Sequence, residues 1–422
     1  MATETVTLEG HIIDSLILAK VLDTILQMGG TFDMNEMKVG ATREESSLTK
    51  IKVQADSPQL LEEILQAIQP HGAVVEQAAN CTLDPAPQNG VLPDSFYATS
   101  HLPTQVRIND QWIDVEHIEM DLAIRVTLNP PTARTVPMAE VKAGEMIITG
   151  RNGVRVFPLE RPKERDVFAF MEAQVSSERP HQHIITDVAK RMRMIRDNRQ
   201  KALTQGAMAC DQDLGTKVLL VGGPAIVHAG GRDALSWLID QGFIHVLFCG
   251  NALAAHDMEA SVYGTSLGYG LCAGRTVPHG HEHHLRTINK VRAAGSIKQA
   301  VESGLIKDGI MASCVRQNVD MVLAGSIRDD GPLPDVITDS VQAQAAMRKE
   351  LPDVGLALMV ATTLHAIATG NCLPAKVPTV CVDINPAVPT KLSDRGSFQA
   401  VGLVMDSSSF LRQLAQELSW HG

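Results

Sequence analysis

The chain has 422 residues, of which 44% are hydrophobic and 20% charged, and its formal net charge is −11. This composition is typical of a soluble globular protein of two or three domains and excludes a largely disordered chain. The acidic surplus argues against a protein that binds nucleic-acid phosphates. Only 4% of the residues are aromatic, whereas 32 are glycine, which favours an α/β enzyme with an aliphatic core and many tight turns.

Residues 1–85 are expected to form a ferredoxin-like α+β unit. Strands are predicted at 6–12, 31–39, 48–55 and 72–77, with helices at 16–28 and 58–69. The second helix follows a serine, the usual N-cap, and ends before a proline and a glycine. The resulting order, β-α-β-β-α-β, is that of a ferredoxin-like fold.

Residues 100–165 are expected to form a small β-rich domain after a boundary rich in proline and glycine. Short alternating runs predict strands at 111–117, 122–128, 133–141, 145–150 and 154–160. Residues 161–205 are predicted to be mainly helical. The basic cluster from Lys190 to Lys201 is interpreted as a solvated helix face rather than a binding patch.

Residues 206–422 are expected to form a Rossmann-like domain. Apolar strands are predicted at 217–221, 244–249, 320–325, 354–361 and 379–385, with helices at 233–241, 287–303, 338–350 and 363–369. Short apolar strands that alternate with helices predict a parallel sheet covered on both faces.

The targeting and cysteine patterns predict a cytoplasmic protein. The first residues lack a basic segment followed by an apolar run, and no apolar stretch is long enough to span a membrane. The chain contains no CxxC pair, and an odd number of scattered thiols favours a reducing compartment. The seven cysteines are Cys81, Cys210, Cys249, Cys272, Cys314, Cys372 and Cys381.

A ligand site is predicted where the parallel strands end, because open parallel sheets bind ligands at their carboxyl edge. Each of the five strands is followed by a polar segment punctuated by glycine or proline, at 222–231, 250–257, 326–335, 362–371 and 384–396. Ordinary turn chemistry also favours these residues, but five such segments at one edge favour a binding crevice.

The glycine pattern allows a dinucleotide without the standard fingerprint. Gly222 and Gly223 follow the first strand and permit close backbone approach to a pyrophosphate, but GxGxxG is absent there. Asp383 ends a strand, as does the acid that binds ribose hydroxyls in such folds. An N-cap or turn role for Asp383 stays open.

The segment His279–His284, HGHEHH, holds four histidines and one glutamate. These side chains are possible metal ligands, but the spacing is not HExxH, so we expect a loop over the active site and no metal. Cys249 is expected to be a packed thiol rather than a nucleophile.

Several motifs identify a family. The strings GPAIVHAGG, CGNALAAHD, YGTSLG, SIRDDGPLPDVITD, GNCLPAKVPTVCVDINP and TKLSDRG, together with LEGHIIDS and FDMNEMKVG, resemble the lysine-oxoglutarate reductase/saccharopine dehydrogenase conserved-region family. This family includes the archaeal-type ornithine cyclodeaminases and half of a cyanobacterial bifunctional arginine dihydrolase. The resemblance covers nearly the whole chain, and SIRDDGPLPDVITD is its most specific motif.

The resemblance implies a C-terminal domain similar to the NAD-binding fold of deoxyhypusine synthase, and NAD as the cofactor. It implies conversion of L-ornithine to L-proline and ammonia. A hydride leaves Cα, the δ-amine closes the ring, ammonia departs, and the hydride returns, so the cofactor can stay bound. The hydrolase domain of the cyanobacterial fusion is not recognised here, so arginine hydrolysis is not implied.

Loop position and motif match together suggest site residues. His256, Asp257 and Asp330 are the catalytic candidates, although Asp257 could instead stabilise its own helix as a first-turn acid. Arg328 could bind the substrate carboxylate, or could pair with Asp329 or Asp335. The residues expected at the cofactor are Asn251, Ala252, Asp330, Thr362, Thr363, Leu364, His365, Asp383 and Asn385.

Other functions stay open. An opine-type dehydrogenase acting on another amino acid would change NADH, and a non-catalytic NAD or amino-acid sensor would bind ligand without turnover. A hydrolase that uses the histidine segment would need a metal. The expected partners are a small amino acid and further copies of the chain in a homo-oligomer, with no nucleic acid and no membrane.

Overall fold

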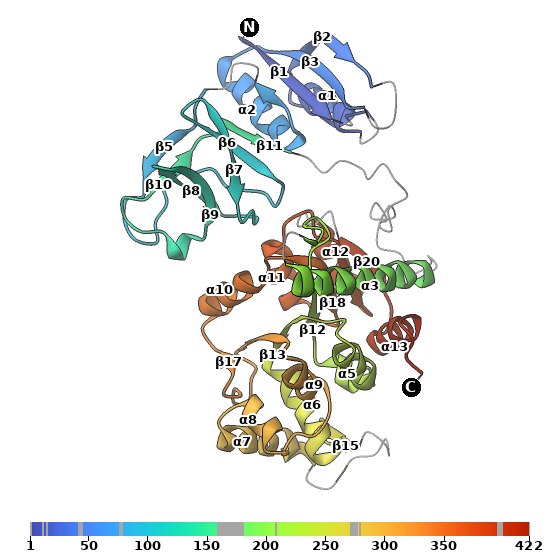
Figure 1. Ribbon diagram of the computed structural model, residues 1–422. Helices are drawn as coiled ribbons and strands as arrows, with labels where there is room; N and C mark the ends of the chain where they lie inside the picture. Colours follow the sequence, from blue (N-terminus) through green and yellow to red (C-terminus); the bar gives the residue numbers. More distant parts are fainter. Residues whose placement is uncertain are drawn as a thin grey trace. The chain divides into compact units, whose positions relative to one another are not determined.

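The computed structural model describes residues 2–10, 12–13, 16–40, 45–75, 79–157, 181–206, 209–270, 277, 280–394 and 400–421. The chain divides into two compact units (Figure 1). Unit 1 comprises residues 1–169 with 371–376, and unit 2 comprises 170–370 with 377–422. No helix among the described residues is long and apolar enough to cross a membrane.

The first sheet of unit 1 has the predicted ferredoxin-like arrangement. Its strands lie in the order β2-β3-β1-β4, and helices α1 and α2 pack against it. The Ser57 hydroxyl caps α2 by accepting a hydrogen bond from the Leu60 amide at 3.1 Å. The elements are β1 (Ala2–Gly10), α1 (Ile17–Gln27), β2 (Thr31–Lys38), β3 (Ser47–Ala55), α2 (Pro58–Ile68) and β4 (Val74–Val75).

The second sheet of unit 1 has seven strands in the order β11-β6-β7-β9-β8-β10-β5. All its pairs are antiparallel except β7 with β9. The buried side of these strands alternates with exposed positions, as the sequence pattern predicts. The strands are β5 (Thr82–Pro85), β6 (Thr104–Ile108), β7 (Gln111–Glu116), β8 (Ala123–Leu128), β9 (Pro131–Val136), β10 (Met146–Thr149) and β11 (Val154–Val156).

Unit 2 contains the predicted parallel sheet, with the order β17-β16-β13-β12-β18-β19-β20. This is the doubly wound order of a Rossmann fold, extended by one short edge strand. Every pair in it is parallel. The strands are β12 (Lys217–Gly222), β13 (Val246–Gly250), β16 (Asp320–Ala324), β17 (Val336–Ile337), β18 (Val354–Val360), β19 (Thr379–Asp383) and β20 (Ala400–Val404); β14 (Thr265–Ser266) and β15 (Tyr269–Gly270) form a separate hairpin.

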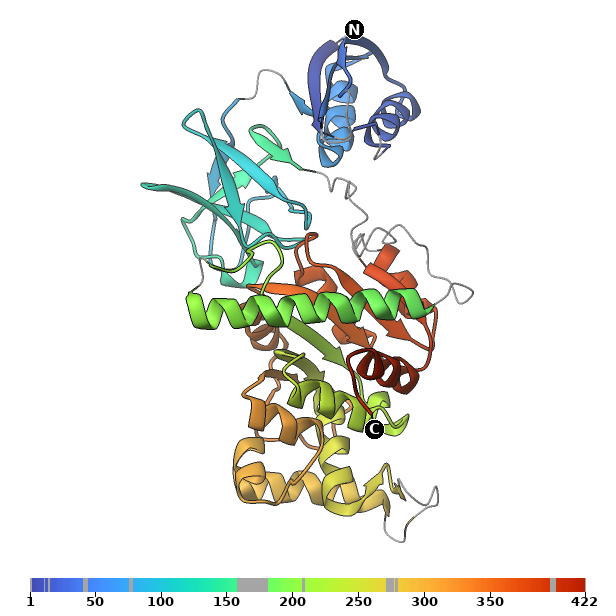
Figure 2. The ribbon, with the colours of Figure 1, turned by 45° about the vertical axis from the view of Figure 1, so that its right-hand side comes forward.

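Helices cover both faces of this sheet (Figure 2). One predicted helix is wrong: residues 287–303 form two helices, because Gly295 ends α7 and Ser296 caps α8 through the Gln299 amide. The helices are α3 (His181–Gln205), α4 (Ala225–His228), α5 (Arg232–Asp240), α6 (Asn251–Tyr263), α7 (His283–Ala294), α8 (Ile297–Glu302), α9 (Ile310–Gln317), α10 (Ser340–Glu350), α11 (Leu364–Cys372), α12 (Ala387–Asp394) and α13 (Ser407–Glu417).

The basic cluster lies on α3, but several of its arginines are not simply solvated. Arg191 donates to the Gly355 carbonyl oxygen at 2.9 Å, and Arg193 donates to the Glu417 carbonyl oxygen. The guanidinium of Arg196 lies 4.4 Å from the centre of the Phe243 ring. These contacts attach α3 to the Rossmann domain.

Candidate active site at the carboxyl edge of the parallel sheet

The strand order reverses between β12 and β18, where a doubly wound sheet opens its ligand crevice. Gly223 follows β12, and its amide donates to the Val360 carbonyl oxygen at 3.0 Å. A Cβ added to Gly223 would lie 1.8 Å from the carbonyl oxygen of Ala361, which itself has a φ of 54°. The backbones on the two sides of the reversal therefore approach so closely that only glycine fits at 223.

On the β13 side, two histidines and a glutamate form one group. His228 ends α4, while His256 and Glu259 lie one turn apart on α6. The Nδ1 atom of His256 lies 3.1 Å from a Glu259 carboxylate oxygen. The His228 and His256 rings meet edge to face with their centres 4.8 Å apart. Helices that follow two neighbouring strands therefore bring their histidines together.

Glu259 is fully buried, and several hydrogen-bond donors hold its carboxylate in place. The Thr265 hydroxyl donates at 2.8 Å, and the amides of Leu267 and Gly268 donate at 3.3 and 3.2 Å. Burial alone would raise the pKa of Glu259, but the hydrogen bonds from His256, Thr265 and Gly268 outweigh it and lower the pKa. The carboxylate of Glu259 therefore orients the imidazole of His256 through their 3.1 Å contact.

Burial sets the protonation of the neighbouring His228. The pKa of His228 is lowered by burial first and by His256 second. The Nδ1 atom of His228 also lies 2.6 Å from the Ser266 hydroxyl. One histidine of the pair is thus held neutral beside another that faces a carboxylate, which is an arrangement suited to proton transfer.

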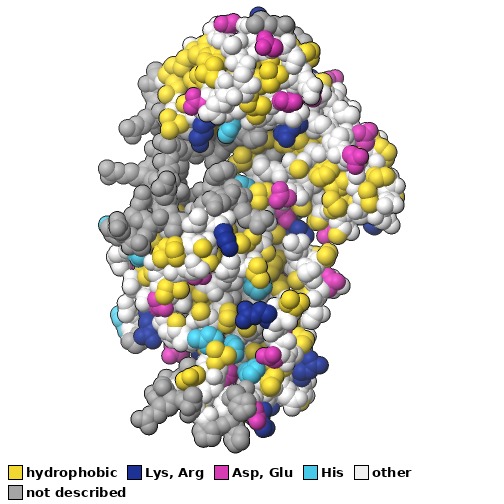
Figure 3. Space-filling view, turned by 180° about the vertical axis from the view of Figure 1, so that it is seen from behind, with side chains coloured by type: hydrophobic (Ala, Val, Ile, Leu, Met, Phe, Trp, Pro, Cys, Tyr) yellow, Lys and Arg dark blue, Asp and Glu magenta, His cyan; other side chains and the backbone are white. Residues whose placement is uncertain are grey.

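The loop 326–335 after β16 adds an exposed acid to this group. Asp330 has a side chain that is 69% exposed, and its carboxylate lies 3.3 Å from Nε2 of His284 on α7. The His284 and His256 rings have their centres 6.2 Å apart. Figure 3 shows histidine side chains gathered on one face of this unit. Asp330 and His256 are therefore linked through His284, a member of the histidine segment 279–284.

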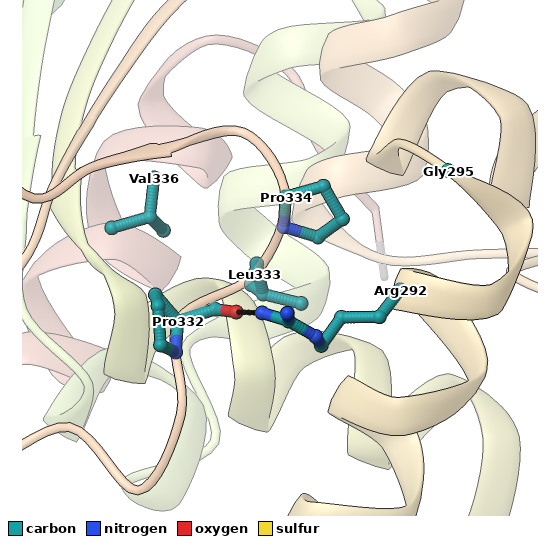
Figure 4. A pocket seen from close by; sticks show the side chains of 6 residues that line it. All are labelled: Arg292, Gly295, Pro332, Leu333, Pro334 and Val336. Atoms are coloured by element: carbon teal, nitrogen blue, oxygen red, sulfur yellow. Dashed lines mark hydrogen bonds between the residues drawn. The ribbon is translucent and has the colours of Figure 1, made fainter.

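Three clamps hold the second half of this loop. Asn251 accepts from the Leu333 amide at 3.0 Å and donates to the Gly331 carbonyl oxygen at 3.4 Å. Arg292 donates to the Pro332 carbonyl oxygen at 2.7 Å, beside a shallow hollow that Figure 4 shows. Asp335 accepts from the Ile297 amide at 2.7 Å. The side chain of Asn251 is thus engaged with the loop, while Ala252 beside it is half-buried.

Arg328 lies in the first half of the loop, and its side chain does not pair with either predicted acid. Asp329 accepts from the Ser326 amide, and Asp335 belongs to the clamp on Ile297. Within the described part of the chain, no hydrogen bond or ion pair engages the Arg328 guanidinium. This leaves a cation available for an incoming carboxylate.

Asp257 departs from its expected place. Its carboxylate is fully buried and accepts from Arg232 at 2.8 Å and from the amides of Ile310 and Met311 at 2.9 and 2.8 Å. Asp257 therefore holds the N-terminus of α9 rather than its own helix, and no oxygen faces the crevice with His256. The geometry corrects the expected catalytic role to a structural one.

On the β18 side, the residues just before α11 and in its first turn face the carboxyl edge of the sheet. Thr362 and Thr363 precede α11 and are half-buried, and Leu364 is 79% exposed. His365 points across the reversal, because a Cβ on Gly250 would lie 3.1 Å from its Cε1 atom. Burial lowers the pKa of His365, so this ring is held neutral.

Asp383 and Asn385 occupy the next strand end and form local turns. Asp383 accepts from the Asn385 amide at 2.8 Å, and Asn385 accepts from the Ala387 amide at 3.0 Å. The turn role that the sequence left open for Asp383 is therefore realised. The amide of Asn385 bonds to only one carboxylate oxygen of Asp383, so the second oxygen is available to a ligand.

The histidine segment is only partly described. His279 lies outside the described residues, and no side chain is described for His281. His283 accepts or donates at the Thr265 hydroxyl at 2.8 Å and stacks on Tyr263, while His284 meets Asp330. Among the described residues no group of three potential ligands is placed to hold a metal.

The sequence patterns did not point to Glu259 and Ser266 as members of the site. Residues 264–268, GTSLG, fit the GxSxG pattern and would have drawn attention to Ser266. Ser266 lies in the β14–β15 hairpin rather than at a strand-to-helix turn, so it is not a nucleophile elbow. The spacing of His256 and Glu259 by three residues on a helix was the other available signal.

Family models match residues 3–414 of the chain. Residues 3–102 match the model of the LOR/SDH bifunctional enzyme conserved region. Residues 103–185 and 186–414 match two models of the arginine dihydrolase ArgZ-like C-terminal part, its first region and its Rossmann fold.

The chain is similar to ornithine cyclodeaminases of archaea. It is 49% identical over 416 residues to that of Methanopyrus kandleri, covering 98% of this chain and 97% of the relative. It is 45% identical over 419 residues to that of Methanococcus maripaludis, covering 99% and 98%. The chain belongs to the ornithine cyclodeaminase family. The family predicted from the sequence motifs is thereby confirmed.

Solved structures agree with this membership. The apo structure of ArgZ, a cyanobacterial arginine dihydrolase, is 37% identical with a TM-score of 0.81 and covers 99% of this family member, which spans 58% of ArgZ. A putative LOR/SDH protein of Methanococcus maripaludis is 46% identical with a TM-score of 0.73, covering 81% of this chain and 98% of that one. AgrE, 41% identical with a TM-score of 0.51 over 99% of this chain and 57% of its own, is known as a ternary complex with ornithine and NAD+.

Proposed function

We propose that this protein converts L-ornithine to L-proline and ammonia, with tightly bound NAD recycled within the reaction. The proposal rests on the family and on the crystallised complex of AgrE with ornithine and NAD+. The observation that carries it is the proton-handling group His228, His256 and Glu259 beside the strand reversal. Loss of one amine and cyclisation of the other both require proton transfer at nitrogen.

The backbone of the crevice and its hydrogen-bonding side chains fit a bound dinucleotide. Gly223 lets the backbones on the two sides of the reversal approach closely, and α6 and α11 begin at the same edge of the sheet. Thr362 and Thr363 offer hydroxyls, and Asp383 offers a carboxylate oxygen beyond its turn. We assign the cofactor to these residues together with Ala252, Leu364, His365 and Asn385. Asn251 contributes chiefly by holding the loop that carries Asp330.

NAD held by these residues would supply a hydride acceptor for Cα of the substrate and would provide the same hydride again after ring closure. The protein's own groups do the remaining work. His256, oriented by Glu259, moves protons at the substrate amines, and Asp330 with His284 covers the reacting atoms. Arg328 binds the carboxylate in a bidentate manner. Ornithine then yields one proline and one ammonia, with no net oxidation.

A labelled substrate tests the proposal most sharply. Purified protein is supplied with ornithine carrying deuterium at Cα, and proline and ammonia are measured together with the nicotinamide absorbance. We expect equal amounts of proline and ammonia, deuterium retained at Cα of proline, and no lasting absorbance change. Lasting NADH would indicate a net dehydrogenase, and ligand binding without products would indicate a sensor; either result contradicts the proposal.

Two variants test the site in the same assay. Arg328→Ala removes the expected carboxylate contact and should raise KM for ornithine by about tenfold or more, since one charge-assisted contact is worth roughly 1.5–3 kcal/mol. Lys349→Ala, on the exposed face of α10, is the matched control and should leave KM unchanged. An unchanged KM in Arg328→Ala would assign the carboxylate to another cation.

A further inference from the structure

Strand β2 is an edge strand of the ferredoxin-like sheet, with β3 on one side. None of its residues is buried, and three exposed apolar side chains lie on it or directly after it. Met34, Met37 and Val39 are 41%, 46% and 56% exposed. Leu26 of the adjacent helix α1 is 54% exposed, and Figure 3 shows hydrophobic side chains gathered on the same N-terminal part at the top of the view. An open edge with apolar side chains is a template for pairing with another strand.

A bulge sets which side chains share a face of β2. The pairing with β3 skips Asn35, so Met34 lies opposite Ile51 and Met37 lies opposite Thr49. Ile51 and Thr49 are both fully buried on the helix-covered side of the sheet. Met34 and Met37 therefore share one face, although their spacing of three residues would separate them in a regular strand.

The charged residues are brought into phase on the other face in the same way. Asp33 lies opposite Lys52, and Lys38 lies opposite Leu48, four residues away along β3. Asp33 accepts from Gln54 at 2.6 Å through one oxygen, and within the described residues Lys38 has no ion-pair partner. The strand thus carries an acid near one end and a base near the other on one face.

We propose that β2 pairs antiparallel with β2 of a second copy of this chain, which extends the sheet across a twofold axis. The axis passes between Asn35 and Glu36. Met34 then lies opposite the second copy's Met37 on the helix-covered face, and Asp33 lies opposite its Lys38 on the open face. Each contact occurs twice, as an isologous interface requires. Without the bulge these pairs would lie on opposite faces and could not meet.

Charge selects this register over its neighbour. Sliding one strand by two residues keeps the faces in phase but places Asp33 opposite Glu36, so two like-charge pairs would face each other. The register centred between Asn35 and Glu36 places opposite charges there and methionine against methionine. A bulge and a lysine commonly protect an open edge. Here the same two features make the edge complementary to itself.

A charge swap on the full-length chain tests the pairing. Asp33→Lys and Lys38→Asp each place like charges opposite each other twice, and each should weaken self-association by about tenfold or more. The double variant Asp33→Lys/Lys38→Asp restores opposite charges and should recover the parent's association constant. The measurement is sedimentation equilibrium over a range of protein and salt concentrations, with Glu63→Lys on α2 as the control for net charge.

Cysteine pairs give a second measure that does not depend on equilibrium. Met34→Cys/Met37→Cys should form a covalent dimer under mild oxidation, whereas each single variant and the parent should not, because each cysteine must face the other position. Circular dichroism verifies that the variants stay folded. Association unaffected by either single charge variant, a double variant that does not recover, or no cross-link in the cysteine pair would each overturn the proposal.

Discussion

The two sides of the strand reversal in the parallel sheet carry different chemistry at the same edge. After β12, β13 and β16 lie titratable groups that contact one another: His228, His256, Glu259 and, through His284, Asp330. After β18 and β19 lie hydroxyls, one neutral histidine, and the turns of Asp383 and Asn385. The same kind of strand-to-helix connection thus carries the groups that we propose for proton transfer on one side and those that we propose for cofactor binding on the other.

The largest effect is expected on the titratable side. His256→Ala removes the imidazole that Glu259 orients and should lower kcat for ornithine by about 10²–10⁴-fold. NAD affinity, measured by calorimetry, should change little because the cofactor is assigned to the other side. His183→Ala, exposed on α3, serves as the control. Near-normal turnover in His256→Ala would move proton transfer to another residue.

Substitution of Asp257, the buried carboxylate next to His256, should lower the stability of the protein rather than kcat. Asp257→Ala leaves Arg232 and the N-terminus of α9 without their buried partner and should reduce the free energy of unfolding by about 3–5 kcal/mol. Asp308→Ala removes the exposed partner of the same arginine and should reduce it by at most about 1 kcal/mol. Urea titrations give both values. A loss of kcat in Asp257→Ala without a loss of stability would restore its catalytic assignment.

The adjacent residues Gly222 and Gly223 test whether stability and NAD binding depend on the close backbone approach at the strand reversal. Gly223→Ala forces a methyl group against the carbonyl oxygen of Ala361 and should cost about 1–3 kcal/mol of stability and weaken NAD binding. Gly222→Ala meets Leu253 Cδ1 at 2.9 Å, a side-chain atom that can move, and should be milder. Thermal unfolding and calorimetry measure the two effects. Equal effects in the two variants would contradict a special role for Gly223.

The smallest effect concerns a histidine just before β13, away from the carboxyl edge. Burial, with Arg199 and Lys217, lowers the pKa of His245 to about 3, and its Nδ1 accepts from the Val218 amide. Below about pH 6.5 the unfolded chain gains a proton that the folded chain refuses, so this residue costs about 2 kcal/mol of stability between pH 7 and 5.

The variant His245→Asn keeps an acceptor for Val218 but does not titrate in this range. The unfolding free energy should therefore fall less steeply between pH 7 and 5 than in the parent. His421→Asn, exposed near the end of the chain, should keep the parental slope. If His245→Asn also keeps that slope, His245 does not carry the pH dependence.

Local patterns predicted the sheet well, because its strands are short apolar runs that contrast with their loops. They did not predict β17, which has only two residues at the edge of the sheet, or β20, whose short apolar run contains Gly402. They also predicted α7 and α8 as one helix. The apolar period of the sequence continues across Gly295, but the helical backbone ends there.

Loop order predicted which segments would meet at the carboxyl edge, but not which partner each side chain would take. Asp257 looks like a first-turn acid in the sequence, yet its partners lie on α9, more than fifty residues later. The only local signal for Glu259 was its spacing from His256, because its other donors come from a hairpin that only the fold brings near it. Long-range partners of buried polar groups are set by tertiary packing, which local periodicity does not encode.

The clamps on the loop 326–335 divide it into an anchored half and a projecting half. Hydrogen bonds attach residues Gly331 to Asp335 to α6, α7 and α8. Ile327 is fully exposed, and within the described residues no hydrogen bond or ion pair engages the Arg328 guanidinium. Residues 326–330 can therefore change in identity or length without disturbing the sheet. Such a segment gives this scaffold a place to evolve new amino-acid preferences while its cofactor crevice and its core stay as they are.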